Sequence, residues 1–496
     1  MDRADKETRK QASRKKNKKR SLTLSAFTII LILTFVLGLV TWLLPEAKFV
    51  AEELIDGSGV ERASLAQTLL APILGFADAI DICLFVLILG AFLKVVTKTK
   101  ALETGIEVLI KKLKGRELIL IPILMFVFSI GGTTYGMLEE TVGFYALLSV
   151  AMVAAGMDTL VASSVVLLGA GSGVLGSTIN PFAVGAAIDA LPENIKVNQA
   201  HIIGIGVVLW LTTYAISTIF VMLYAKKVIK DKGSTFLSLQ ERKDMEETYA
   251  PKEDNSKTIP KLTKMQKVTL WLFFLTFVFM IIGFIPWEDF GINLFAKGKF
   301  FAFITGLPLG QWYFQESTLW FLIMTVVLGI VNGMSEHEFV DTFVDGADDM
   351  VGVILVIAIA RGASVLMTQT HLDNYIIFNA AKGLSNVSKI VFAPLNYILH
   401  VGLSVLVPSS SGLASLSTPI MGPLAHELGF SVETTIMEMV AANGLVNLFT
   451  PTCGAIMGGL ELAKVQYTTW LKWVAKVIVT IAIVNIVILT VAMVIL

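Results

Sequence analysis

The sequence predicts an all-α polytopic membrane protein whose two halves form an inverted repeat. Three observations carry this prediction. Hydrophobic residues make up 55% of the 496 residues and charged residues only 16%, whereas a soluble domain carries roughly 25% charged residues. The apolar residues gather in runs of about 20, the length of a helix that spans a bilayer. Polar residues, glycine and proline interrupt apolar stretches at matching places in the two halves.

The N-terminal segment predicts the orientation of the chain. Its first 20 residues contain ten Lys or Arg and three Asp or Glu. Because basic segments stay on the cytoplasmic side of a membrane, we expect residues 1–21 to form a basic cytoplasmic tail. The apolar run 22–44 is too long for the core of a signal peptide, so we expect it to be a retained first span.

Eight further spans are expected after the first. They lie at about 79–97, 157–190, 201–227, 268–285, 316–333, 349–369, 431–462 and 470–496. Nine crossings place the C-terminus outside. The loop charges agree with this orientation. Residues 226–267 hold eleven Lys or Arg, and loop 46–65 holds five acidic and two basic residues. A further basic cluster is expected inside: Lys111, Lys112, Lys114 and Arg116.

A polar segment, 228–266, divides the chain into halves. It is rich in Lys, Glu, Asp and Ser, which is typical of a flexible linker, and its charge places it in the cytoplasm. The first half, 22–227, forms one repeat, and the second half, 267–496, holds an extra span and the other repeat. An amphipathic segment precedes the interrupted stretch of each repeat, at 102–106 and 372–376.

Each repeat then contains an interrupted apolar stretch and a broken span. The interrupted stretches, 117–155 and 388–427, are too short to cross twice, so we expect re-entrant hairpins. The broken spans, 157–190 and 431–462, each hold a polar residue directly before a proline. The span count starts the first repeat inside and the second outside. The repeats are therefore inverted, which is the design of many secondary transporters.

The four polar breaks form the candidate binding site. Non-helical backbone at membrane depth leaves amide and carbonyl groups without partners, unless protein or a water-filled cavity satisfies them. Small and hydroxyl residues also mediate helix packing, but four breaks paired across a repeat favour a solute site. Half-helix N-termini would suit a carboxylate. The expected binding residues carry hydroxyl, amide or carboxyl groups: Thr133, Thr134, Glu139, Glu140, Ser177, Thr178, Asn180, Ser409, Ser410, Ser411, Asn447, Thr450 and Thr452.

Three ionisable residues stand out near the first hairpin tip and in a later span. Glu139 and Glu140 follow the tip directly, and a carboxylate at the bilayer centre costs at least about 2.5–3.5 kcal/mol. They therefore need a cationic substrate, a coupling proton or a buried base. Adjacent residues of a helix face different ways, so we expect one of the two to line the site. Arg361 is expected to pair with Glu139 or Glu140, and binding a substrate carboxylate is its alternative role.

The second repeat contains three further ionisable residues. Glu438 and Glu461 lie in the broken span, where either could carry a proton, although a position facing a vestibule is favoured. His400 lies in the second hairpin. It is expected to be a hydrogen-bonded core histidine rather than a ligand.

Other motifs in the sequence do not indicate a functional site. The GxGxxG match at 171–176 lies inside a span and has no βαβ unit around it. Close helix packing through Gly169 and Gly173 is the better interpretation. Two cysteines give neither a disulfide framework nor zinc spacing. The sequence therefore predicts no cofactor, no metal and no nucleic-acid partner.

The motifs at the first hairpin and the first broken span resemble a known family. Gly131 to Glu140, GGTTYGMLEE, and Gly176 to Phe182, GSTINPF, are similar to the YfcC family. That family is grouped with DcuC-type C4-dicarboxylate carriers in the ion transporter superfamily. The resemblance covers nearly the whole chain. It implies an elevator motion, a scaffold that forms a homodimer, and a central substrate or ion site containing Ser177, Thr178, Asn180, Asn447 and Thr450.

The substrate is predicted from the charge at the hairpin tips. Members of the family are variously labelled dicarboxylate carriers and basic amino-acid antiporters. A dicarboxylate site should be rich in positive groups, but the tips carry Glu139 and Glu140 and no Lys or Arg. We therefore expect a plasma-membrane transporter of a basic amino acid, of the arginine/ornithine exchange type. A C4-dicarboxylate carrier driven by an ion gradient is the alternative. A membrane enzyme would need His400 to act with Ser409 to Ser411, and it is disfavoured.

Overall fold

The computed structural model describes residues 26–50, 53–55, 57–102, 104–105, 108, 116–249, 262–284, 287–290, 292, 294–298 and 301–496. The expected basic tail, residues 1–21, lies outside this part, as do Lys111, Lys112 and Lys114. The described chain is almost entirely helical. Two short strands, β1 (Phe49–Val50) and β2 (Glu53–Leu54), pair antiparallel in the loop after the first helix.

The prediction of a polytopic helical membrane protein is confirmed. Within the described residues, eight helical segments are long and apolar enough to cross a membrane: Ile80–Lys98, Glu117–Thr134, Gln199–Lys230, Lys264–Phe284, Phe314–Val331, Glu336–Gln369, Lys389–Leu406 and Tyr467–Ile495. The expected broken spans are absent from this set because each is divided into shorter helices. The first arm of each expected hairpin is in it, because each arm reaches 18 residues.

The first half begins with helices α2 (Ala26–Val40), α3 (Leu65–Asp78) and α4 (Ile80–Lys98). The first expected hairpin consists of η1 (Glu117–Ile119), α6 (Leu120–Tyr135), η2 (Glu139–Thr141) and α7 (Val142–Ala154). The first broken span consists of α8 (Thr159–Leu175), the π-helical η3 (Pro181–Gly185) and α9 (Ala186–Asp189). Helix α10 (Gln199–Lys230) ends this half. Both interruptions fall where the sequence breaks predict them.

The second half follows the same order after several added elements. Those elements are η4 (Lys232–Ser234), α11 (Leu239–Tyr249), α12 (Lys264–Phe284), η5 (Trp287–Phe290), α13 (Leu294–Lys297), α14 (Ala302–Thr305), α15 (Phe314–Val331) and α16 (Glu336–Asp348). Helices α17 (Val351–Gln369) and α18 (Leu372–Leu384) precede the second expected hairpin, α19 (Lys389–Leu406) and α20 (Ser410–Glu427). The second broken span is α21 (Val432–Val446) and α22 (Gly454–Leu462), and α23 (Tyr467–Ile495) ends the chain.

The expectation of a flexible linker at 228–266 is wrong for its described first part. Helix α11 lies within it, and Glu241 on that helix is 1% exposed. The Glu241 carboxylate accepts hydrogen bonds from the backbone N–H of Gln466 (2.8 Å) and the hydroxyl of Thr469 (3.1 Å). The Tyr249 hydroxyl donates to the backbone carbonyl of Leu462. These polar contacts fix a helix whose composition, read alone, suggested disorder.

Glycines bring the first hairpin and the first broken span close together. A Cβ added to Gly173 of α8 would lie 2.0 Å from the carbonyl oxygen of Ser129, and one added to Gly132 of α6 would lie 2.1 Å from that of Ala170. Such distances leave no room for any side chain. Close packing at Gly169 and Gly173, predicted in place of a nucleotide motif, is therefore confirmed.

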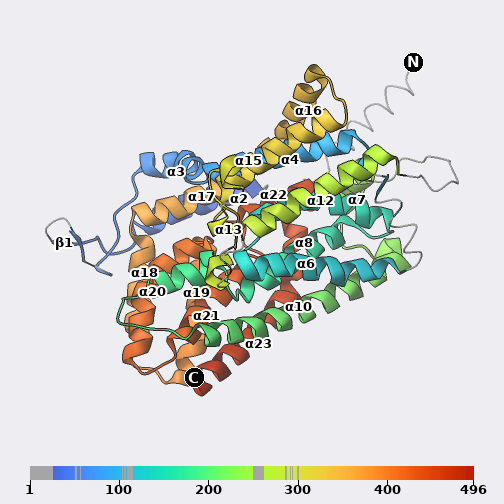
Figure 1. Ribbon diagram of the computed structural model, residues 1–496. Helices are drawn as coiled ribbons and strands as arrows, with labels where there is room; N and C mark the ends of the chain where they lie inside the picture. Colours follow the sequence, from blue (N-terminus) through green and yellow to red (C-terminus); the bar gives the residue numbers. More distant parts are fainter. Residues whose placement is uncertain are drawn as a thin grey trace, which may run out of the picture.

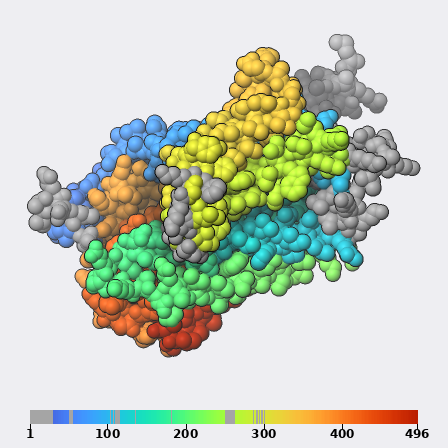
Figure 2. Space-filling view, in the orientation of Figure 1, coloured from blue at the N-terminus to red at the C-terminus, as the bar shows by residue number. Residues whose placement is uncertain are grey.

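The helices form two groups that lie on opposite sides of the molecule. In Figure 1, α4, α12, α15 and α16 lie on one side and α10, α21 and α23 on the other. Figure 2 shows this division at the surface, with the gold α16 region opposite the red C-terminal region. The rings of Phe92, Phe277 and Phe321 pack at centroid distances of 5.0–6.0 Å and join α4, α12 and α15.

The two broken helices run in opposite directions. Asp158, at the start of α8, accepts a hydrogen bond from Thr235 of the linker (2.6 Å). Glu433, at the start of α21, instead accepts a hydrogen bond from the backbone N–H of Asn198 (2.8 Å). Asn198 is the N-cap of α10. Helix α10 has 32 residues, about 48 Å, and its other end joins the linker. The two broken helices therefore begin at opposite ends of the molecule.

Candidate functional site

The four polar breaks all contribute residues to the lining of one cavity of about 230 Å³. The first hairpin contributes Gly136 and Leu138 to Glu140, and the first broken span contributes Val174, Asn180 and Phe182. The second hairpin contributes Pro408 to Ser411, and the second broken span contributes Asn447 and Thr452 to Gly454. The breaks are far apart in the sequence, so only the fold brings their polar groups together.

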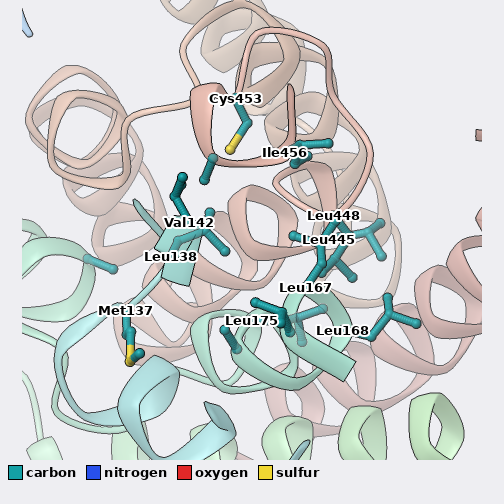
Figure 3. Packing of buried hydrophobic residues seen from close by; sticks show 14 of the residues in the cluster. Met137, Leu138, Val142, Leu167, Leu168, Leu175, Leu445, Leu448, Cys453 and Ile456 are labelled. Atoms are coloured by element: carbon teal, nitrogen blue, oxygen red, sulfur yellow. The ribbon is translucent and has the colours of Figure 1, made fainter. Parts of the chain in front are cut away.

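The broken helices cross directly behind this cavity. A Cβ added to Gly444 of α21 would lie 2.3 Å from Cα of Leu175 on α8, and one added to Gly171 would lie 2.0 Å from the side chain of Leu448. Figure 3 shows the buried apolar side chains around the crossing, with Leu175 and Leu445 among them. This close crossing places the end of α8 against the end of α21, and thus one break against the other.

Eight of the thirteen sequence-predicted residues line the cavity: Glu139, Glu140, Asn180, Ser409, Ser410, Ser411, Asn447 and Thr452. The other five do not. Thr133 bonds Thr178 across the α6–α8 contact (3.2 Å), and Thr134 bonds the carbonyl of Ile130 in its own helix (2.7 Å). Ser177 and Thr450 contact lining residues instead. Ser177 accepts from Asn180 Nδ2 (3.0 Å), and Thr450 bonds Thr452 (2.7 Å).

Two helix N-termini border the cavity. Ser409 caps α20 by accepting a hydrogen bond from the backbone N–H of Gly412 (3.2 Å), and Ser410 and Ser411 form the first turn. Cys453 is the N-cap of α22, whose first residue is Gly454. Unpaired N–H groups and the helix dipole make such termini favourable for anions. This part of the cavity is therefore suited to a carboxylate.

The second hairpin and α21 share a polar network at the cavity wall. Asn443 accepts from Ser410 (2.8 Å) and from Asn447 Nδ2 (3.0 Å), and both asparagines donate to the carbonyl of Pro408. The Oδ1 atom of Asn447 is buried and has no hydrogen-bond partner in the described structure. A buried acceptor is costly without a donor. Asn447 therefore presents an open acceptor beside the cavity.

Both glutamates line the cavity, so the expectation that only one would do so is wrong. They lie in η2, a three-residue 3₁₀ turn at the hairpin tip, and both border the cavity although they are adjacent. The Glu140 side chain is 4% exposed and accepts from the backbone N–H of Leu138 (3.1 Å). The two carboxyl groups make this wall of the cavity acidic.

Arg361 also lines the cavity, but its expected partner is wrong. Its guanidinium Nε pairs with Asp78 Oδ2, at the end of α3, rather than with Glu139 or Glu140. Asp78 and Arg361 are separated by 283 residues, and the contact depends on α3 packing against α17. A Cβ on Gly75 of α3 would lie 2.3 Å from the carbonyl of Ala358. Among the described residues, Arg361 provides the only guanidinium on the cavity wall, and a carboxylate already engages it.

Several lining residues were not predicted from the sequence. Ile82 of α4, Phe314 of α15 and Ile357 of α17 form the wall opposite the breaks. They lie in ordinary apolar helices, which offer no local signal of a site. Their position shows that the cavity lies where the hairpins and broken helices meet α4, α15 and α17.

Comparisons with known proteins identify the family of this chain. Residues 24–494 match the family described as DcuC, C4-dicarboxylate anaerobic carrier. An uncharacterized protein of Haemophilus influenzae is 30% identical over 405 residues, covering 82% of this chain and 74% of the relative. The putative basic amino acid antiporter YfcC of Escherichia coli K12 is 26% identical over 410 residues, covering 80% and 74%.

Two solved structures show a distant likeness. The YdaH transporter of Alcanivorax borkumensis has a TM-score of 0.44 and 16% identity, covering 94% of this chain and 98% of its own. MtrF of Neisseria gonorrhoeae, titled one of a class of antimetabolite efflux pumps, has a TM-score of 0.40 and 14% identity, covering 95% of both chains. The family match spans nearly the whole chain, and the protein is a multi-pass membrane transporter that belongs to the DcuC family of carriers, as the YfcC-like motifs predicted.

Proposed function

We propose that this transporter moves a basic amino acid across the cell membrane by exchange of the arginine/ornithine type. The observation that carries the proposal is the charge on the cavity wall. Glu139 and Glu140 line it, and the guanidinium of Arg361 is held by Asp78. A site with two carboxyl groups and one neutralised base favours a cation, because burying an unpaired carboxylate is costly.

The part of the cavity that the N-termini of α20 and α22 border suits the α-carboxylate of an amino acid. The N-termini of α20 and α22 offer positive dipole ends and hydroxyl donors there. The unpartnered Oδ1 of Asn447 is an acceptor for an ammonium group. A volume of about 230 Å³ is smaller than the roughly 300–1,000 Å³ of drug-sized pockets, which supports a small metabolite as the substrate.

We further propose that the two halves work as an inverted repeat with an elevator motion. The opposite directions of α8 and α21 support the inversion. The position of the cavity, between the break-bearing helices and α4, α15 and α17, supports movement of one group against the other. The expected hairpins, 117–155 and 388–427, would move together with the broken spans. The homodimer implied by the family resemblance remains part of this proposal.

The orientation is proposed from the linker. Eleven Lys or Arg between 226 and 267 favour the cytoplasm for this segment. Helix α23 begins beside α11, because Gln466 bonds Glu241, and its 29 residues extend about 43 Å. That length exceeds the roughly 30 Å hydrocarbon core, so the C-terminus would lie outside.

The alternative substrate is a C4-dicarboxylate. The family description names that class, and two helix N-termini together with Arg361 could hold two carboxylates if Asp78 released the arginine. In this case one or both glutamates would carry coupling protons. The substrate classes differ in net charge, so direct transport distinguishes them.

Purified protein in liposomes loaded with ornithine provides the test. With no proton gradient applied, we expect uptake of labelled arginine that stops when internal ornithine is omitted. We expect Glu139→Gln and Glu140→Gln, made separately, to reduce this exchange, and Glu461→Gln, at an exposed position outside the cavity, to leave it unchanged. Uptake of succinate or malate without arginine exchange would establish the dicarboxylate alternative. Normal affinity, rate and pH dependence in both cavity variants would contradict the charge argument.

A further inference from the structure

A second buried carboxyl lies outside the cavity, on α21. Glu438 is 0% exposed, and its Oε2 accepts a hydrogen bond from Asn396 Nδ2 of α19 at 2.6 Å. Its other oxygen, Oε1, has no hydrogen-bond partner in the described structure, and neither does Oδ1 of the same Asn396. The expectation that Glu438 faces a vestibule is therefore wrong. Two acceptors on joined side chains both lack a donor.

No cation compensates this carboxyl among the described residues. None of the ion pairs that the described residues form includes Glu438. An unpaired carboxylate in such a position is costly enough that the group takes up a proton instead. A single proton on Oε1 would also supply the donor that both orphaned oxygens need.

The other buried titratable groups near Glu438 already have hydrogen-bond partners of their own. Helix α21 packs against α8, α10, α19, α20 and α23. The fully buried titratable side chains on those helices are Tyr397 and His400, both on α19. His400 Nδ1 donates to the carbonyl of Asn396 (2.8 Å), and Nε2 shares a hydrogen bond with the hydroxyl of Ser417 (2.6 Å). Both imidazole nitrogens are thus engaged by groups other than Glu438, and the Tyr397 hydroxyl accepts a hydrogen bond from Asn485 Nδ2 (3.2 Å).

The position of Glu438 links it to the moving parts of the site. It joins α21 to α19, whose end leads to the hairpin tip at Pro408. The same α21 carries Asn443, bonded to Ser410 at that tip, and Asn447 at the cavity. Nine residues of helix separate Glu438 from Asn447, about 14 Å. A charge at Glu438 would therefore act on the contact that holds the second hairpin against α21.

We propose that Glu438 is a proton-binding site of the transporter, separate from the substrate cavity. The proton resides on Oε1, between Glu438 and Asn396, and keeps the α19–α21 contact closed. Its release, into water admitted when the helices separate, leaves a carboxylate, and the empty carrier returns only in this unprotonated form. Proton binding thus controls net uptake, whereas exchange of one substrate for another proceeds with the proton in place. The proposal rests on the transporter class and not on the substrate.

The first experiment needs no substrate. Infrared spectra of the purified full-length protein at neutral pH report the carbonyl band of protonated carboxyl groups. We expect Glu438→Gln to remove one such band and Asn396→Ala to shift its frequency. The matched control, Glu461→Gln, changes an exposed carboxyl on the same broken span and should leave the band in place. A spectrum in which Glu438→Gln removes no band would overturn the proposal.

The second experiment separates net uptake from exchange. Labelled arginine, and in parallel labelled succinate, is offered to proteoliposomes that are empty or preloaded with the same compound, with an inward proton gradient. For the compound that is transported, we expect Glu438→Gln to lose at least tenfold of the gradient-driven uptake into empty vesicles and to keep exchange. Glu461→Gln should retain both.

Three outcomes would overturn the proton site: gradient-driven uptake that persists in Glu438→Gln, the absence of such uptake from the wild type, or a requirement of the uptake for sodium. Movement of neither compound would count against the proposed function, and the infrared result would still decide the protonation of Glu438.

Discussion

At the scale of single residues, the polar side chains of the breaks divide into two kinds. Asn447 and Asn180 face the cavity, whereas Thr134 bonds the carbonyls of Ile130 and Gly131 in its own helix. Sequence composition cannot make this division, because all three have the same polar character and lie in similar breaks. The division depends on which side of each break the neighbouring helix covers.

This division leads to the first prediction. Asn447→Ala removes the open Oδ1 and the two amide hydrogen bonds to Pro408 and Asn443, a loss of about 1–3 kcal/mol. We expect the rate of transport at low substrate concentration to fall about tenfold, since 1.4 kcal/mol is a factor of ten. Thr134→Ala is the matched control and should stay within twofold of the wild type. Equal losses in the two variants would show that the open acceptor has no special role.

The ion pair of Arg361 and Asp78 allows a second prediction that distinguishes the substrates. Asp78→Asn leaves the guanidinium on the cavity wall without its partner carboxylate. A free positive charge there should raise the KM for a cationic substrate about fivefold, the equivalent of roughly 1 kcal/mol. For a dicarboxylate the same variant should lower the KM. Asp349→Asn, which breaks the exposed pair with Lys94 far from the lining, should change neither. No change in Asp78→Asn would mean that Arg361 does not contact substrate.

At the scale of elements, the breaks and the remaining helices were predictable to different degrees. Each break combines glycine or proline with hydroxyl or amide residues inside an apolar run, so its position could be read locally. Helix α3 was missed because its 14 residues are shorter than a span. Its contact with α17 also decides the partner of Arg361, and no local pattern reports a pairing between residues so far apart.

Helix α11 shows the opposite error, and it carries the third prediction. Burial raises the pKa of Tyr249 from 10.0 to about 12. A raised pKa in the folded state means that docking is fully stabilised below pH 10 and weakens as the pH rises toward about 12. We expect proteolysis within residues 239–249 to accelerate over this range. Tyr249→Phe should remove that pH dependence, because phenylalanine cannot ionise.

Glu241→Ala provides a second measure of α11 docking, independent of pH. It leaves the N–H of Gln466 and the hydroxyl of Thr469 without their acceptor, at a cost of about 1–3 kcal/mol. Proteolysis of α11 should therefore accelerate at neutral pH as well. The control is Glu247→Ala, which removes an exposed pair with Lys243. Equal protection of α11 in Glu241→Ala and the wild type would mean that the docked helix is held by other contacts.

At the scale of the whole molecule, the hydrogen bonds at helix ends determine the relative sides of the segments. Gln466 lies beside α11 and Asn198 beside the start of α21, so α10 and α23 both connect the two ends of the bundle. Charge alone predicts only that the linker faces the cytoplasm. If the linker is cytoplasmic as proposed, these contacts would place the start of α23 in the cytoplasm and the C-terminus outside.

The last prediction tests this assignment with an impermeant maleimide on intact cells. Cys83 and Cys453 are both buried, and replacing the cavity-lining Cys453 by serine removes the one thiol that a ligand-sized reagent could reach. In that background, Leu496→Cys at the end of α23 should react from outside. Lys243→Cys, whose parent side chain is 67% exposed on α11, should react only after the membrane is permeabilised. Both positions reacting from the same side would be incompatible with a 29-residue α23 that crosses the bilayer, because its start is bonded to the linker. Reaction of Lys243→Cys alone from outside would keep the fold and reverse its orientation, contradicting the assignment that the basic linker supports.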